Sequence, residues 1–107
     1  MSVTHDALRH EFSVIDSASG AKAYLQYSLV GKGKGKGKGK GKAKKNVMDM
    51  FHTFVPPELR GQGIAAKLVE AGMQYAEAEQ YEVLPTCSYI SETFLLKHPQ
   101  YLRLVRS

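Results

Sequence analysis

The sequence predicts a single α+β domain spanning residues 1–107, in which one main helix packs on a mostly antiparallel four-stranded sheet. Three observations support this fold. Several segments before residue 56 alternate apolar and polar residues with the period of two that half-buried strands show. The segment from residue 63 repeats apolar residues at helical spacing. A short strand and two helical pieces follow, so the predicted order is βββαβα.

The first two strands are predicted at residues 8–14 and 23–29, with a turn at Ser19-Gly20 that makes them a hairpin. The third strand is predicted at residues 47–55, which are rich in β-branched and aromatic residues. It ends at Pro56-Pro57, because proline cannot donate to a sheet ladder.

Residues 31–45 interrupt this pattern with eight lysines, and six consecutive Gly-Lys pairs run from Gly31 to Lys42. Glycine raises the entropic cost of ordering and neighbouring lysines repel each other, so we expect a flexible hairpin-loop insertion between strands two and three. The whole chain carries a net charge of +5, but without this segment seven basic residues face ten acidic ones. The remaining fold is therefore mildly acidic.

The lysines from Lys32 to Lys45 are an alternative source of function, since they could contact the phosphates of nucleic acid or an acidic partner. No aromatic residues alternate with the lysines, so stacking on bases is excluded and such binding would be non-specific. An insertion without this role is the interpretation that we favour.

An amphipathic helix is predicted from Gly63 to about Glu79. Its apolar residues lie on one side: Ile64, Ala65, Leu68, Val69, Gly72, Met73 and Ala76. A short strand at residues 82–87 follows, and then helical pieces at 92–96 and 101–105 are separated by Pro99. A strand, a helix and a strand in succession imply a right-handed crossover, so strands three and four should be parallel with the helix on one sheet face.

The segment Arg60-Gly61-Gln62-Gly63-Ile64-Ala65 is a candidate cradle for a diphosphate at the start of this helix. The first turn of a helix has N–H groups without intrahelical partners, and the helix dipole adds positive charge there. Glycine at positions 61 and 63 lets the backbone approach phosphate oxygens, and Arg60 adds a cation at the entrance.

Other interpretations of these glycines are weaker. Residues 61–66 fit the dinucleotide fingerprint G-x-G-x-x-A, with Glu82 at the spacing of the ribose-binding acid, but 25 residues after Glu82 cannot complete a nucleotide-binding sheet. The Gly-Lys pairs lack the spacing of a P-loop and are followed by no Ser or Thr. The remaining alternative is a pair of glycines that only shapes a turn before a helix.

The neighbouring motifs favour the interpretation of residues 60–65 as a diphosphate cradle. The order strand, Val55-Pro56, Arg60-x-x-Gly63-x-Ala65, helix, strand resembles motif A of the GNAT acetyltransferase superfamily. More narrowly, the chain is similar to a small single-domain, acetyltransferase-like branch of GNAT, which has the patterns D-x-x-H-T-x-V-P, R-G-x-G-I-A and P-x-C-S-Y. These patterns match residues 49–56, 60–65 and 85–89, whereas the Lys-rich loop departs from the family.

The resemblance implies a minimal GNAT-like fold that binds acetyl-CoA, with the pantetheine arm of coenzyme A between splayed strands three and four. The backbone of Thr53, Phe54 and Val55 would then bind pantetheine, and residues 60–65 would hold the diphosphate.

Three residues are catalytic candidates. His52 precedes the pantetheine-binding stretch and is the candidate base, because a free imidazole titrates near neutral pH. Tyr89 lies where many superfamily members have a tyrosine acid, and Cys87 is a candidate acetyl-accepting nucleophile. The alternatives are structural: a histidine hydrogen-bonded within the sheet, a core aromatic residue and a small buried hydrophobe.

The expected function is transfer of acetyl from acetyl-CoA to an amine, such as a protein lysine or N-terminus. The acceptor is unspecified, because larger GNAT enzymes have additional elements for it that this chain has no room for. Non-catalytic binding of CoA or acyl-CoA is therefore an alternative.

The composition and the apolar pattern limit which metals, membrane spans and locations are expected. One cysteine and four histidines give no zinc-ligand spacing, so no metal is expected. No apolar run approaches the roughly 20 residues of a membrane span. The sequence also shows no secretory signal, and we expect an intracellular protein, cytoplasmic or nuclear.

Overall fold

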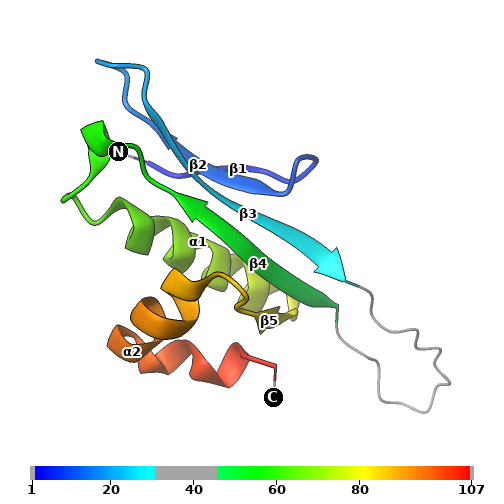
Figure 1. Ribbon diagram of the computed structural model, residues 1–107. Helices are drawn as coiled ribbons and strands as arrows, with labels where there is room; N and C mark the ends of the chain where they lie inside the picture. The colour runs from blue at the N-terminus through cyan, green and yellow to red at the C-terminus, as the bar shows by residue number, and fades with distance from the viewer. Residues whose placement is uncertain (1, 31–45, 107) are drawn as a thin grey trace, which may run out of the picture.

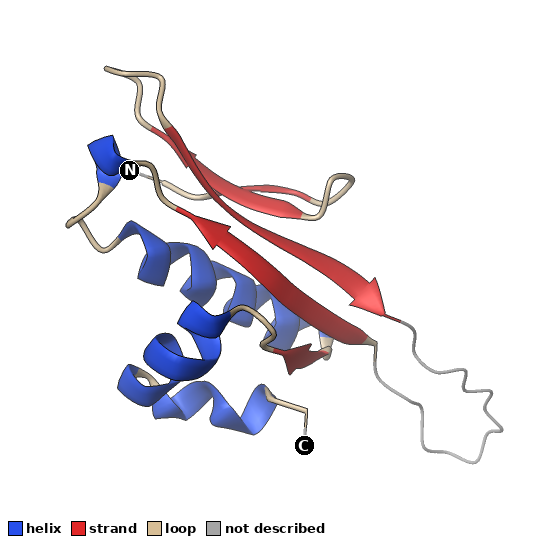
Figure 2. Cartoon of the chain, in the orientation of Figure 1, coloured by secondary structure: helices blue, strands red, loops and turns tan. Residues whose placement is uncertain are grey.

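The computed structural model describes residues 2–30 and 46–106 as a five-stranded sheet with helices packed on one face (Figures 1 and 2). The strands are β1 (Thr4–Asp6), β2 (Glu11–Ile15), β3 (Lys22–Val30), β4 (Val47–Phe54) and β5 (Glu82–Leu84). They lie in the order β1-β2-β3-β4-β5. The pairs from β1 to β4 are antiparallel, and β4 and β5 are parallel. The predicted α+β class and the parallel pair are confirmed.

The prediction of four strands was wrong, because an additional strand, β1, lies before the segment expected as a strand at residues 8–14. Residues 8–10 of that segment form a turn. A turn separates β1 from β2, and its backbone N–H groups at Leu8 and Arg9 both donate to Asp6 Oδ1 at 3.1 Å. His10 closes the turn in the left-handed region, with φ 56°. A short polar side chain that bonds the backbone ahead of it favours such turns. The sheet therefore gains a fifth strand at its edge.

β1 is anchored to the sheet by His5. Its Nε2 lies 2.7 Å from the Tyr27 hydroxyl, and its ring stacks on Phe12 with centroids 4.0 Å apart. These contacts are needed because β1 is only three residues long.

Helix α1 (Ile64–Glu79) crosses between β4 and β5 and covers one face of the sheet (Figure 1). Its Gly72 lies so close to the sheet that a Cβ there would come within 3.1 Å of both Leu25 and Met50. The buried residues of the helix are Ile64, Leu68, Val69, Gly72, Met73 and Ala76. No helix of the described residues is long and apolar enough to cross a membrane.

The segment after β5 returns to pack on α1. It contains a π-helical turn η2 (Ile90–Phe94), which continues into α2 (Leu95–Lys97), and a 3₁₀ helix η3 (Pro99–Leu104). The Tyr101 hydroxyl donates to Glu70 at 3.3 Å, and Arg103 pairs with Glu77 at 2.8 Å. These two contacts tie η3 to α1.

A β-bulge at Phe51 interrupts the pairing of β3 with β4. Tyr27 pairs with Met50 and Gln26 pairs with His52, so Phe51 is an extra residue in β4. Before the bulge Met50 faces α1, as does its partner Tyr27. After it, the alternation of faces is reversed in β4.

Val30 pairs with Val47 at the far end of these strands. The residues that join them, 31–45, include the whole of the predicted Gly-Lys insertion, which lies outside the described residues.

Candidate functional site

The paired strands β4 and β5 separate beside the middle of α1, where Met50 packs against Gly72. They pair over Val47–Asp49. The Cys87 N–H then donates to the Met50 carbonyl at 3.0 Å, and β4 continues to Phe54 without pairing to β5. The edge of β4 from Met50 to Phe54 therefore has no strand partner on the β5 side, and we call this unpaired stretch the opening.

The first turn of α1 has free backbone donors. Its first intrahelical bond runs from the Lys67 N–H to the Gly63 carbonyl at 3.1 Å, so the N–H groups of Ile64, Ala65 and Ala66 have no intrahelical partner. No side chain caps this end, and no acidic residue lies in the first turn. The donors remain available to an anion.

The two glycines before the helix have backbone conformations that other residues adopt at a cost. Gly61 has φ 82° and Gly63 has φ 72°, and a Cβ at either position would meet no atom within 4 Å. The space beside both glycines is therefore open. An open backbone surface with free N–H donors fits a phosphate group.

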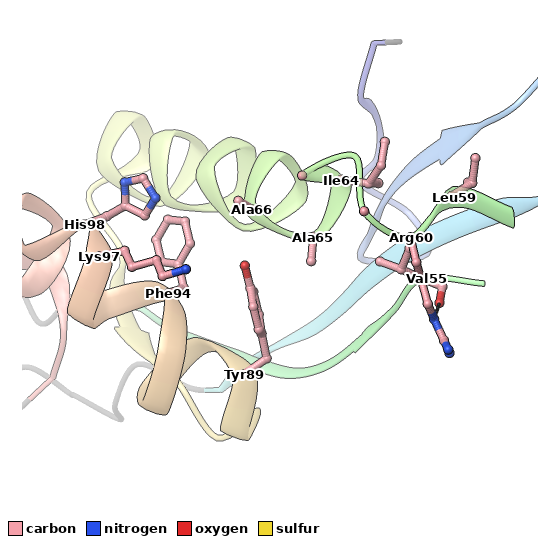
Figure 3. A pocket seen from close by; sticks show the side chains of 12 residues that line it. Val55, Leu59, Arg60, Ile64, Ala65, Ala66, Tyr89, Phe94, Lys97 and His98 are labelled. Carbon is pink, nitrogen blue, oxygen red and sulfur yellow. Dashed lines mark hydrogen bonds between the residues drawn. The ribbon is translucent and has the colours of Figure 1, made fainter. Parts of the chain in front are cut away.

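These features border a cavity of about 300 Å³, which Figure 3 shows from close by. One wall is formed by residues between Val55 and Ala66, and the opposite wall by residues between Tyr89 and His98. No acidic residue lines it within the described part of the chain. The segment predicted as the cradle therefore forms part of one wall of this cavity.

Arg60 takes a different position from the expected entrance cation. Its Nε donates to the Val55 carbonyl at 3.0 Å, and the guanidinium lies beside Val55, away from Tyr89 (Figure 3). Gln62 also bonds within the loop, with Nε2 3.5 Å from the Glu58 carbonyl. Both side chains hold the loop that carries the glycines.

Tyr89 lines the cavity, whereas Cys87 does not line it and lies where β4 and β5 separate. The half-buried Cys87 thiol donates to Thr53 Oγ1 at 3.6 Å. The Tyr89 hydroxyl points across the cavity toward α1 (Figure 3). Burial, and then the nearby Cys87, raise the pKa of Tyr89 above its usual value of 10.0. The hydroxyl keeps its proton at neutral pH and can act as a donor.

The structure does not bring His52 to this cavity. His52 pairs with Gln26 on the sheet face opposite α1, where its ring lies 5.7 Å from that of Tyr24. Phe54 lies on the same face, 5.5 Å from Tyr24 between ring centroids, so only its backbone can contribute to the opening. Thr53 pairs with Leu25 and faces the helices.

Sequence reasoning missed the second wall of the cavity, which includes Phe94, Lys97 and His98. The His98 and Phe94 rings stack with centroids 4.5 Å apart. Their spacing of three and four residues indicates a shared helix side. It does not indicate that this side returns to the start of α1.

Comparison with known proteins identifies close likenesses. The family model of the GCN5-related N-acetyl-transferase matches residues 11–104. Protein NATD1 of Danio rerio is 35% identical over 105 residues, covering 96% of this chain and 83% of the relative. Protein NATD1 of Xenopus tropicalis is 34% identical over 102 residues, covering 94% and 81%.

A solved structure shares the fold. The NMR structure of a GCN5-like protein from Staphylococcus aureus superimposes with a TM-score of 0.67 at 22% identity. The match covers 99% of this chain and 88% of that protein.

Proposed function

Because the chain belongs to the GCN5-related N-acetyltransferase family, we propose that it transfers an acetyl group from acetyl-CoA to an amine. One observation carries this proposal: a cavity joins the uncapped first turn of α1 to Tyr89, beside the end of β4 that has no β5 partner. Acetyl-CoA would supply the acetyl group as an activated thioester. The acceptor that we propose is a protein lysine or N-terminus.

The residues along the opening fit the parts of the coenzyme. The free edge of β4 and the turn after it, from Thr53 to Val55, offer backbone groups to the pantetheine amides. The cradle from Arg60 to Ala65 would hold the diphosphate with its N–H groups, and the glycines leave room for it.

Tyr89 is the proposed acid. Its raised pKa keeps a proton on the hydroxyl, which faces the cavity and can protonate a departing thiolate. Cys87 is the proposed nucleophile, because the bond to Thr53 holds its thiol where the strands separate.

His52 could serve as the base for an amine that approaches from the other face of the sheet. In the described residues no helix covers that face around Tyr24, His52 and Phe54. The acceptor and the coenzyme would then lie on opposite sides of the sheet.

A second candidate function is CoA binding without turnover. The position of His52 favours it, because the predicted base does not line the cavity. An enzyme and a binding module differ in the release of free CoA.

The test combines titration calorimetry with CoA and thiol detection after incubation with acetyl-CoA. A lysine peptide, a peptide with a free N-terminal amine and a polyamine serve as acceptors. Binding with acceptor-dependent CoA release supports the enzyme. Binding without release for any acceptor supports the module, and absence of CoA binding overturns both.

A further inference from the structure

Lys97 extends into the cavity from the wall opposite the first turn of α1. It lies at the end of α2 and lines the cavity, and its ammonium points toward the Tyr89 hydroxyl (Figure 3). Among the described residues the ion pairs are Arg9–Asp6, Lys22–Glu11 and Arg103–Glu77, so none of them engages Lys97. A cation without a carboxylate partner therefore lies on the wall opposite the first turn of α1, whose three N–H groups have no intrahelical partner.

Arg60, the cation that the motif favours, is oriented otherwise. Arg60 also lines the cavity, but its Nε donates to the Val55 carbonyl at 3.0 Å and its guanidinium points away from Tyr89 and Lys97. The bond closes the loop between the end of β4 and the glycines. Arg60 is thereby placed to fix the shape of the cradle.

We propose that Lys97, and not Arg60, supplies the cationic contact to the coenzyme diphosphate, while Arg60 is a positioning residue for the cradle. The inference rests on the proposed function, since it assigns residues of the same site. The lysine ammonium is a compact point charge that suits phosphate. Facing a helix N-terminus, it would complete an anion site with donors on two sides.

The roles differ in which ligands they affect. A cation at the diphosphate raises the affinity for CoA and for 3′-dephospho-CoA equally, but not for pantetheine, which has no phosphate. A residue that shapes the loop affects the affinity for all three ligands, because Val55 and the glycines belong to the same loop. The 3′-phosphate alone distinguishes CoA from 3′-dephospho-CoA.

The experiment measures dissociation constants of these three ligands by calorimetry, with competition for pantetheine. Lys97→Met should weaken CoA and 3′-dephospho-CoA by about tenfold and leave pantetheine unchanged. Lys97→Arg should restore most of the affinity. Lys67→Met is the matched control, because Lys67 is exposed on α1 and does not line the cavity. Arg60→Met should weaken all three ligands by a similar factor.

Three outcomes would overturn the proposal. They are wild-type affinity in Lys97→Met, a loss confined to CoA, and a loss confined to the two phosphate-bearing nucleotides in Arg60→Met. Thermal unfolding without ligand checks that Lys97→Met is folded, as expected for an exposed side chain. If the wild-type chain binds none of the ligands, the proposed function itself fails, which is a separate result.

Discussion

The Cys87 thiol lies 3.6 Å from the Thr53 hydroxyl oxygen, across the point where β4 and β5 separate. This contact joins β4 to the segment after β5, beyond their backbone pairing. It also fixes the position of the thiol that we propose as the nucleophile.

If Cys87 accepts the acetyl group, Cys87→Ala should lower kcat by at least about 100-fold and leave CoA affinity within about twofold. Mass spectrometry after incubation with acetyl-CoA alone should find acetyl on Cys87. Ser88→Ala, at the exposed neighbour, is the control. Full activity in Cys87→Ala would assign the thiol a packing role.

Tyr89→Phe should lower kcat by about 10² to 10⁴, because it removes a proton donor without changing the ring. The pKa of Tyr89 is raised, so the protonated form persists above pH 10 and activity should fall only at higher pH. Rates measured at a series of alkaline pH values test this loss of activity. Tyr81→Phe, at a residue that does not line the cavity and packs on Tyr75, should retain activity.

Gly63→Ala should destabilise the protein by about 1–2 kcal/mol, because alanine is strained at φ 72°. It should also weaken CoA by about tenfold or more, since the Cβ enters the space beside the cradle. Gly20→Ala is the matched control. Gly20 has φ 77° and equally open surroundings, but it lies in the β2–β3 turn. An equal loss of CoA affinity in both variants would contradict the cradle.

The anchor of β1 should make stability fall in acid. Burial is the main cause that lowers the pKa of His5 below 6.5, and Asp6 and His10 act in opposite directions. The unfolded chain therefore binds the proton first, and the free energy of unfolding decreases as pH falls below about 6.5. Urea unfolding at pH 7.5 and 5.5 measures the decrease.

His5→Gln should reduce that acid dependence, because it removes the imidazole whose pKa burial lowers. Equal acid dependence in the wild type and in His5→Gln would show that the imidazole does not cause it.

Replacement of residues 31–45 by one glycine should preserve the fold, since Gly-Asn46 can join Val30 and Val47 as a two-residue turn. Loop closure contributes little at such lengths, so the unfolding transition should remain cooperative. CoA affinity should also persist, because Val47 begins β4 and the cavity lies beyond its other end, at Val55. If the affinity for nucleic acid is unchanged, the lysines of residues 31–45 do not bind nucleic acid. A non-cooperative unfolding transition would contradict the assigned strands.

Much of the fold could be predicted because its signals are local. The helical spacing from Ile64 and the prolines after β4 marked the central elements, and the crossover rule gave the parallel pair. β1 was missed because three residues are too few for a periodic signal. The alternation at residues 8–14 predicted a strand that includes residues 8–10, which form a turn.

The site could be predicted in part. The glycines and the helix start follow from a contiguous motif, and the structure places them beside a cavity. His52 was less predictable, since simple alternation from Met50 places it on the helix side. The bulge at Phe51 reverses that alternation, and bulges leave no mark in hydrophobic periodicity. Lys97 required knowledge of where the last helices pack.

The two bonds that hold η3 against α1, from Tyr101 to Glu70 and from Arg103 to Glu77, have a thermodynamic consequence. The residues of the second wall directly precede η3 in the chain. The packing of this wall on α1 is therefore linked to the packing of η3 on α1. A ligand that bridges both walls binds the docked form alone. Ligand binding should therefore slow the hydrogen exchange of the η3 backbone, although η3 does not line the cavity.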